Sequence, residues 1–286
     1  MVYACSVAGI IREARRPAGW VPPGPQPAGA RGRPELEPRD DEDLCFLTGE
    51  WRLFQKQRGH RWSLDDLVTA WVAAPHIEAA KATRVLDLGC GLGSVLLMHA
   101  WRFPGLDVTG VEAQLDRAAM ARRSIAFNGC EDRCRVLDGD LRDPALFSGG
   151  DRFELITGTP PYFPPGAGTK SDKPHAFPCR FEVRGGVEEY AEAAARWLAP
   201  GGRFVVVTGA LERERVTLGA NTVGLHIVEH LEVIPREGKP ALICVDVMAR
   251  EPMPRVERTL TVRDARSQWT PAFLELRAQM GMPPSP

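Results

Sequence analysis

The residues best suited to chemistry form a glycine-rich turn that follows a short apolar run at 85–88. That run predicts a buried strand, and it contains Asp87. Three alternating glycines, Gly89, Gly91 and Gly93, come next, and an apolar helical pattern begins directly after them. A strand, a glycine turn and a helix in this order form the nucleotide-binding cradle of a doubly wound α/β sheet. Because glycine permits positive φ and lets a ligand approach the backbone closely, the turn predicts a site for a nucleotide-like ligand.

The spacing of these glycines separates the turn from a dinucleotide-binding fingerprint. That fingerprint reads G-x-G-x-x-G and places a pyrophosphate over a helix N-terminus. Here the pattern is G-x-G-x-G, with Asp87 two positions before the first glycine. It resembles the S-adenosylmethionine (SAM) loop of class I methyltransferases. The resemblance implies SAM as the cofactor, with a carboxylate near Asp87 helping to hold its ammonium group; an ordinary tight turn is the alternative.

Two further acidic residues stand at the ends of the next predicted strands. Glu112 follows the run 106–111, about 20 residues past the glycine turn, where a carboxylate usually binds ribose hydroxyls. Asp140 follows the run 134–137, where class I methyltransferases place a residue against the adenine amino group. A lone Asp in a turn is the alternative for Asp140. The candidate cofactor-binding residues are Asp87, Gly89, Cys90, Gly91, Gly93, Glu112, Asp140 and Leu141.

The predicted strand 153–158 leads into Thr159-Pro160-Pro161-Tyr162, and we take all four of these residues as candidate catalytic residues. The sequence resembles the catalytic loop of amino-group methyltransferases, which usually reads Asn, Asp or Ser, then Pro-Pro and Tyr or Phe. Proline fixes φ and donates no hydrogen bond, so the turn is rigid. An aromatic ring beside it can stack on a base, which is worth roughly 1–3 kcal/mol.

The resemblance implies that the first side chain of this loop and the Pro160 carbonyl accept the two N–H bonds of an exocyclic amine. Such acceptors align the nitrogen lone pair with the methyl donor, which is catalysis by positioning. This chemistry needs no general base or metal, so we predict no metal site. Thr159 departs from the family pattern: its hydroxyl can accept a hydrogen bond, but it is shorter than Asn and stiffer at its β-branch. A Pro-Pro turn that merely closes a strand is the alternative.

Several further stretches narrow the resemblance. The lead-in Gln55…Gly59-His60-Arg61-Trp62-Ser63-Leu64-Asp65 is similar to the opening of bacterial tRNA adenine methyltransferases that act on the anticodon loop of valine tRNA. The Pro-Pro-Tyr-Phe-Pro-x-Gly stretch at 160–166, the stretch 179–182 and the closing 260–264 with 269–271 are also similar to that family. The resemblance implies methylation of the exocyclic amine of adenine in RNA and, most specifically, in tRNA. Adenine in an anticodon loop can splay outward, which lowers the cost of unstacking it.

Two other functions stay open from the sequence. A protein glutamine methyltransferase acting on release factors shares the Pro-Pro-Tyr loop, because its target is also a planar amide nitrogen. Such enzymes usually carry a separate helical N-terminal domain, which this chain does not show. A non-catalytic SAM-binding scaffold is the second alternative, prompted by Thr159.

RNA contacts are expected from a basic run at 55–61 and from a long Pro- and Gly-rich insert at 163–186. Long loops inside compact domains are usually lids or binding loops, although a solvated surface loop is the alternative. The candidate substrate-binding residues are Phe163, Arg180, Lys56 and Arg61.

The bulk composition bounds the architecture. With 286 residues, 44% of them hydrophobic, the chain can form one packed α/β domain plus an extension. We predict a Rossmann-like doubly wound sheet of seven strands, whose antiparallel edge hairpin is formed by 223–234 and 241–248. Because the net charge is only −1, any contact with nucleic acid must come from a local patch.

Proline and glycine mark the organisation of the chain. They concentrate in 17–43, so we expect a disordered extension at 1–45 and a methyltransferase domain at 46–286, in which Ser63 caps the first helix. The seven cysteines form no C-x-x-C pair, which favours a reducing compartment and a cytoplasmic location. No apolar run approaches about 18 residues, so we predict no contact with a membrane. An organellar targeting segment at 1–16 is the alternative location signal, against which Glu13 and the scarcity of Ser speak.

Overall fold

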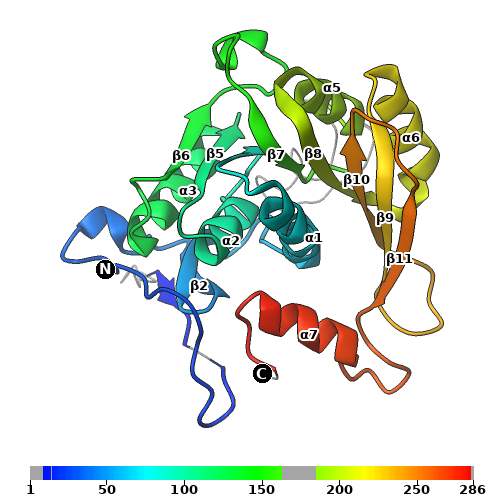
Figure 1. Cartoon of the computed structure of the whole chain (residues 1–286). Helices are drawn as coiled ribbons and strands as arrows, with labels where there is room; N and C mark the ends of the chain where they lie inside the picture. Colours follow the sequence, from blue (N-terminus) through cyan, green and yellow to red (C-terminus); the bar gives the residue numbers. More distant parts are fainter. Residues whose placement is uncertain (1–8, 14, 163–184, 285–286) are drawn as a thin grey trace, which may run out of the picture.

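The computed structural model describes residues 9–13, 15–162 and 185–284 (Figure 1). A large twisted sheet forms its centre, with strands in the order β11-β9-β10-β8-β7-β4-β5-β6. These strands are β4 (Arg84–Leu88), β5 (Asp107–Glu112), β6 (Cys134–Asp138), β7 (Phe153–Gly158), β8 (Leu198–Gly209), β9 (His226–Ile234), β10 (Ile243–Ala249) and β11 (Val256–Thr261).

The pairing confirms the predicted doubly wound topology. Strands β6, β5, β4, β7 and β8 pair in parallel, so their carboxyl ends meet at one edge of the sheet. β10 then runs antiparallel to both β8 and β9, which is the expected edge hairpin. The predicted count of seven strands is wrong, because β11 pairs in parallel with the outer side of β9 as an eighth strand. Most of β11 is exposed and only Leu260 is buried, so it lacks the apolar run that would predict a strand.

Helices cover both faces of this sheet (Figure 1). The buried side chains of α1, α2 and α3 share one core with Val205 and Val207 of β8, whereas those of α5 and α6 share a second core with Phe204 and Val206. Successive residues of a strand point to opposite faces, so the apolar run of β8 serves both cores. The helices are α1 (Leu64–Ala80), α2 (Ser94–Arg102), α3 (Leu115–Asn128), α5 (Val187–Trp197), α6 (Arg213–Thr222) and α7 (Pro271–Gln279), with short 3₁₀ turns η1 (Pro34–Leu36), η2 (Pro144–Leu146) and η3 (Ala210–Glu212).

A small second sheet differs from the expected organisation of the N-terminal segment. It consists of β1 (Ile10–Ile11), β2 (Glu42–Thr48) and β3 (Trp51–Lys56). The expected boundary at residue 45 therefore falls inside β2. The segment before β2, which we expected to be disordered, follows a defined path: Leu36 is 1% exposed, and Arg123 of α3 donates to the carbonyls of Glu35 and Glu37 at 2.7 Å. Extended backbone of this kind can lie along a surface by using a few anchors, which composition alone does not reveal.

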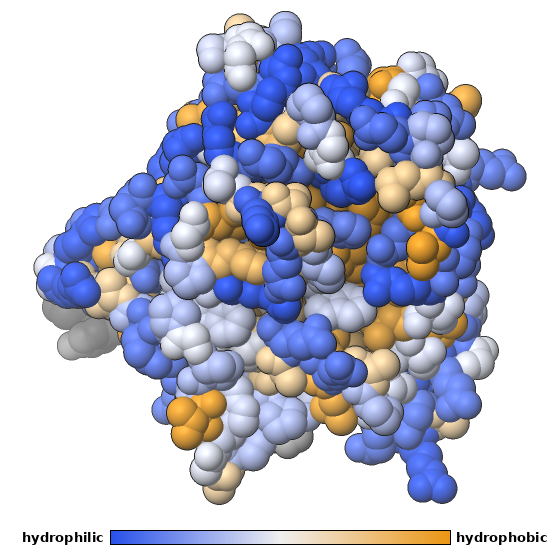
Figure 2. Space-filling view, viewed as in Figure 1, coloured by the Kyte–Doolittle hydropathy of each residue, from blue (hydrophilic) through white to orange (hydrophobic). Residues whose placement is uncertain are grey.

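The surface is mostly polar. Hydrophilic residues dominate the face shown in Figure 2, and hydrophobic residues appear there in small groups. Within the described ranges, no helix is both long enough and apolar enough to span a membrane.

Candidate active site

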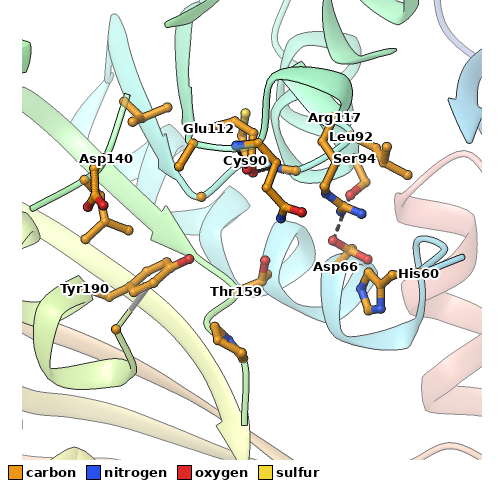
Figure 3. Close-up of a pocket in the computed structure, with 18 of the residues that line it drawn as sticks. His60, Asp66, Cys90, Leu92, Ser94, Glu112, Arg117, Asp140, Thr159 and Tyr190 are labelled. Carbon is orange, nitrogen blue, oxygen red and sulfur yellow. Dashed lines mark hydrogen bonds between the residues drawn. The ribbon is translucent and has the colours of Figure 1, made fainter. Parts of the chain in front are cut away.

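A pocket opens where β4, β5 and β7 end, at the carboxyl edge of the parallel strands (Figure 3). This is the edge at which open α/β sheets bind their ligands. Residues from the glycine turn, from the ends of β5 and β6, from the turn after β7 and from the start of α1 all contribute to the wall. The lining residues are His60, Trp62, Asp66, Gly89, Cys90, Gly91, Leu92, Ser94, Val111, Glu112, Ala113, Gln114, Arg117, Gly139, Asp140, Leu141, Thr159, Pro161, Gly185 and Tyr190.

The glycine turn is shaped by its lack of side chains. Gly89 has φ +59° and Gly91 has φ +57°, conformations that L residues rarely adopt. A Cβ atom at Gly89 would lie 2.1 Å from the hydroxyl oxygen of Tyr190, and one at Gly91 would lie 2.5 Å from Nη2 of Arg117. Backbone conformation therefore favours glycine at both positions, and the ends of the Tyr190 and Arg117 side chains lie close to the backbone of the turn.

Asp87 lies at the end of β4 and is 2% exposed. Its Oδ1 accepts a hydrogen bond from Thr157 Oγ1 at 2.7 Å, whereas its buried Oδ2 has no hydrogen-bond partner among the described residues. Burial raises the pKa of this carboxyl to about 7, although the bond from Thr157 acts in the opposite direction. Asp87 is not among the lining residues of the pocket.

Glu112 ties the end of β5 to the glycine turn. Its Oε2 accepts from the backbone N–H of Gly91 at 2.9 Å, and its Oε1 accepts from the backbone N–H of Gln114 at 2.7 Å. The carboxylate is 6% exposed and lines the pocket. It therefore fixes the turn and at the same time presents acceptor oxygens to the cavity.

Asp140 lies across the pocket from Asp66 and His60 (Figure 3). Its two carboxylate oxygens accept from the guanidinium of Arg142 at 2.8 Å and 2.6 Å. The backbone N–H of Arg142 also donates to Asp140 at 3.0 Å. This turn after β6 is thereby held with Asp140 and Leu141 on the pocket wall.

The Thr-Pro-Pro turn after β7 reaches the same pocket as the glycine turn. Thr159 and Pro161 line it, Thr159 is half-buried, and its side chain faces the cavity in Figure 3. Pro160 is buried behind them. Tyr162 is not among the lining residues: its ring packs against the core, and its hydroxyl donates to Asp65 Oδ2 at 2.9 Å. The expected stacking of this ring on a base stays a prediction.

The start of α1 supplies site residues that the sequence reasoning missed. Asp66 lines the pocket, and its Oδ1 accepts from Ser94 Oγ at 2.7 Å (Figure 3). Its Oδ2 accepts from the backbone N–H of Ser63 at 2.8 Å. Burial and the neighbouring charge of Asp65 raise the pKa of Asp66 to about 7. The acidic pair after Ser63 indicated a helix start, and nothing in its spacing indicated a pocket.

Tyr190 of α5, His60 and Arg117 of α3 were also missed. The quoted lead-in includes His60 without assigning it a role in the site, and no motif marks Tyr190 or Arg117. Tyr190 is the clearest case, since its ring also lies 2.6 Å from where a Cβ at Gly158 would stand. Gly89 in the turn after β4 and Gly158 at the end of β7 make room for this one side chain, a relation that only the fold reveals.

The predicted substrate-binding residues are not brought together in this pocket. Lys56 forms ion pairs with Asp41 at 2.8 Å and Glu42 at 3.5 Å, and Arg61 pairs with Asp43 at 2.6 Å. Neither lines the pocket. Phe163 and Arg180 lie outside the described residues.

Comparison with known proteins places this geometry in a family. A model of the methyltransferase small domain matches residues 66–177. A Porphyromonas gingivalis protein named tRNA1(Val) (adenine(37)-N6)-methyltransferase is 30% identical over 222 residues, which cover 73% of this chain and 84% of that protein. A Tolumonas auensis protein of the same name is 28% identical over 198 residues, covering 68% of this chain and 80% of that protein.

The fold has a counterpart among solved structures. A predicted O-methyltransferase from Agrobacterium tumefaciens superposes with a TM-score of 0.60 at 19% identity, covering 77% of this chain and 98% of that one. The described pocket, the glycine turn and the relatives agree with the resemblance seen in the sequence. The chain therefore belongs to the family of class I SAM-dependent methyltransferases represented by these Porphyromonas and Tolumonas relatives.

Proposed function

We propose that this protein methylates the exocyclic N6 amine of an adenine in tRNA, with adenine 37 of a valine tRNA as the first substrate to test. The observation that carries the proposal is the meeting of two turns in one pocket. The Thr159 turn, which resembles an amine-binding loop, lines the same cavity as Gly91 and Glu112 of the predicted cofactor site. The relatives' names supply the base and the RNA.

The residues of the pocket fit SAM. Asp87 keeps one buried carboxylate oxygen without a hydrogen-bond partner, which suits a cationic group of the cofactor. Asp66, Glu112 and Asp140 add three carboxylates to the lining, and the bare backbone at Gly89 and Gly91 leaves room for close approach. When bound, SAM supplies an electrophilic methyl group.

We assign the cofactor contacts to residues already in place. Glu112 presents its oxygens at the end of β5, where ribose hydroxyls are bound in sheets of this type. Asp140 and Leu141 form the wall beyond it, where the adenine of the cofactor belongs, and Cys90 and Gly93 complete the glycine turn.

The chain's part in the reaction is to hold the target amine. Thr159 Oγ1 and the Pro160 carbonyl accept its two N–H bonds, which leaves the nitrogen lone pair directed at the methyl group. The two prolines keep the acceptors fixed, so little order has to be gained during the reaction.

A protein glutamine methyltransferase is not favoured, because the relatives are named for tRNA. A non-catalytic scaffold is not favoured either, because Thr159 faces the pocket with an acceptor hydroxyl. We also propose a cytoplasmic location, where tRNA and SAM are both present.

The test is methyl transfer from radiolabelled SAM to separate pools of tRNA, ribosomal RNA and release factor. We expect label in tRNA, recovered as N6-methyladenosine after nuclease digestion, and a rate about 100-fold lower with a Thr159→Val control. Label in release factor alone, or in a different nucleoside, would overturn the proposal.

A further inference from the structure

A second cavity, of about 470 Å³, adjoins the cofactor pocket and is rich in arginine. We call it the arginine groove and define it by Arg12, Arg15, Arg16 and Arg277, with Phe46 on its wall. Trp62 lines both cavities, so one side chain borders the groove and the cofactor pocket.

Both ends of the described chain build this groove. The segment before β2 supplies three of the arginines. The fourth, Arg277, lies in α7, and the residues after α7 also line the groove. The two parts are joined at the turn between β2 and β3. Thr48 Oγ1 donates to the Met280 carbonyl at 2.6 Å, and the N–H of Gly49 donates to the Gly281 carbonyl at 2.9 Å.

Two of the four guanidinium groups already have a carboxylate partner, although Arg12 shares its partner, Asp43, with Arg61. Arg12 forms an ion pair with Asp43 at 2.8 Å, and Arg16 forms a two-pronged pair with Glu50. These pairs fix the positions of both side chains. Arg15 and Arg277 are the two groove arginines without an ion pair in the described residues, and Glu13 adds one carboxylate to the same lining.

Arg15 and Arg277 have no carboxylate partner in the described part of the chain. Arg15 is exposed on the rim. Arg277 donates to the Pro283 carbonyl at 2.9 Å and stacks over Trp269 at 4.0 Å. Burial lowers the pKa of Arg277 to about 10, the direction expected of a cation removed from water without a counter-ion. Both groups can therefore gain an anion without breaking an existing pair.

Aromatic rings accompany the arginines. The guanidinium of Arg16 lies 4.7 Å from the centre of the Phe46 ring, and that of Arg52 lies 3.9 Å from it. The N–H groups of Arg16 are already bound to Glu50, whereas Arg277, which is stacked on Trp269, has no carboxylate partner in the described residues. Basic side chains interleaved with aromatic ones are typical of surfaces that bind single-stranded nucleic acid.

We propose that the arginine groove binds the sugar–phosphate backbone of the RNA substrate beside the methylated base, with Arg15 and Arg277 as its phosphate contacts. This inference rests on the proposed function. It differs from the expectation for the basic run, because Lys56 and Arg61 are held in ion pairs and have less charge to offer.

The test compares RNA binding of Arg15→Glu, Arg277→Gln and a control, Arg152→Glu. Arg152 is exposed and precedes β7, so it lies at the end of the parallel strands opposite the pocket. The probe is a fluorescently labelled, unmodified valine tRNA transcript, whose anisotropy is titrated at several salt concentrations. Methylation of the same RNA gives kcat and KM, and calorimetry gives the Kd of SAM.

Loss of a phosphate contact should weaken RNA binding and reduce its salt dependence. We expect Arg15→Glu to raise the Kd and the KM for RNA by about tenfold and to lower the slope of log Kd against log salt by about 1. Its kcat at saturating RNA and its Kd for SAM should equal those of the unaltered protein. Arg277→Gln should act in the same direction, and Arg152→Glu should change none of these values.

Failure of this inference can be told from failure of the proposed function. If the unaltered protein methylates tRNA while Arg15→Glu and Arg277→Gln bind it as well as Arg152→Glu does, the groove is not the RNA site. If the unaltered protein methylates no RNA, the proposed function fails first. If the unaltered protein methylates a protein substrate and neither binds nor methylates RNA, both proposals are overturned. Circular dichroism of each variant ensures that a loss of binding is not a loss of fold.

Discussion

Thr159 is the residue at which this chain departs from the usual amine-binding loop, and it decides whether the turn is catalytic. Its side chain faces the pocket, where a hydroxyl can accept one N–H bond of the target amine. Thr159→Val keeps the β-branched shape and removes the acceptor, so we expect kcat to fall by about 100-fold. The Kd of SAM, measured by calorimetry, should not change. Thr159→Asn restores an acceptor and should retain turnover; full activity in Thr159→Val would show that the hydroxyl is dispensable.

Asp87 gives the site a dependence on pH near neutrality. Its pKa is raised to about 7, because burial disfavours the charged form. A cationic ligand needs the ionised carboxylate, so the affinity for SAM should fall as the pH drops below about 7. Calorimetry from pH 5.5 to about 8.5 measures this trend, and Asp87→Asn should bind SAM weakly with a flatter profile. A wild-type affinity that is constant across this range would contradict the assignment of Asp87 to the cofactor.

The same shift has a consequence for stability without a ligand. Because the folded pKa of Asp87 lies above its unfolded value of about 3.9, the native state binds the proton more tightly. The contribution of Asp87 to the free energy of unfolding should therefore be largest at pH below about 4 and should decline as the pH rises through about 7. Urea unfolding of Asp87→Asn and of the unaltered protein should show the variant gaining in relative stability across this interval. A difference independent of pH would mean that this carboxyl titrates normally.

At the scale of elements, the N-terminus of α1 connects the two turns that form the pocket. Asp65 accepts from the Tyr162 hydroxyl of the catalytic turn at 2.9 Å, and Asp66 accepts from Ser94 beside the glycine turn at 2.7 Å. Burial and the charge of Asp65 raise the pKa of Tyr162 well above its ordinary value, so this phenol stays a donor. If the Thr159 turn binds the amine as proposed, Asp65 acts on it through Tyr162, as a positioning residue.

Breaking this link should slow methyl transfer and leave the cofactor site intact. We expect Tyr162→Phe, which keeps the ring, to lower kcat by about tenfold through looser positioning of Thr159 and Pro160. Asp65→Ala should have a similar effect, and the double variant should cost no more than either single change. Steady-state kinetics measure these values, with the Kd of SAM as the control. Fully additive losses would show that the two residues act separately.

Local sequence patterns predicted the elements of the site better than its contacts. The glycine turn, the strand ends carrying Glu112 and Asp140 and the turn at Thr159 were all expected from short-range apolar runs, and the doubly wound sheet followed from their order. Asp66 could not be assigned to the pocket, because its partner Ser94 lies 28 positions away along the chain. β11 was missed because an exposed edge strand buries too little apolar surface to leave a pattern.

At the scale of the whole molecule, the N-terminal segment is a packed part of the protein in the described structure. Leu36 is its buried anchor, with 1% of its surface exposed, and Arg123 of α3 fixes the backbone on either side of it. The composition of this segment indicated disorder because proline and glycine are frequent and apolar residues are few. Leu36, the bonds from Arg123, the pairing of β1 with β2 and the ion pairs of Arg12 and Arg16 all hold it in place, and none of these features changes the average composition.

This packing predicts that Leu36→Ala destabilises the whole domain. Removing a buried leucine side chain leaves a cavity and should cost about 2–5 kcal/mol of the free energy of unfolding, if the segment unfolds together with the core. The matched control is Leu211→Ala. Leu211 is 98% exposed, so this substitution makes the same chemical change without leaving a cavity. Urea unfolding, followed by tryptophan fluorescence and circular dichroism, measures both variants.

Equal stabilities for the two variants would mean that the segment around Leu36 detaches before the core unfolds. In that case the arginine groove, which this segment helps to build, would also be present only part of the time, and RNA affinity would fall in Leu36→Ala without any change in SAM binding.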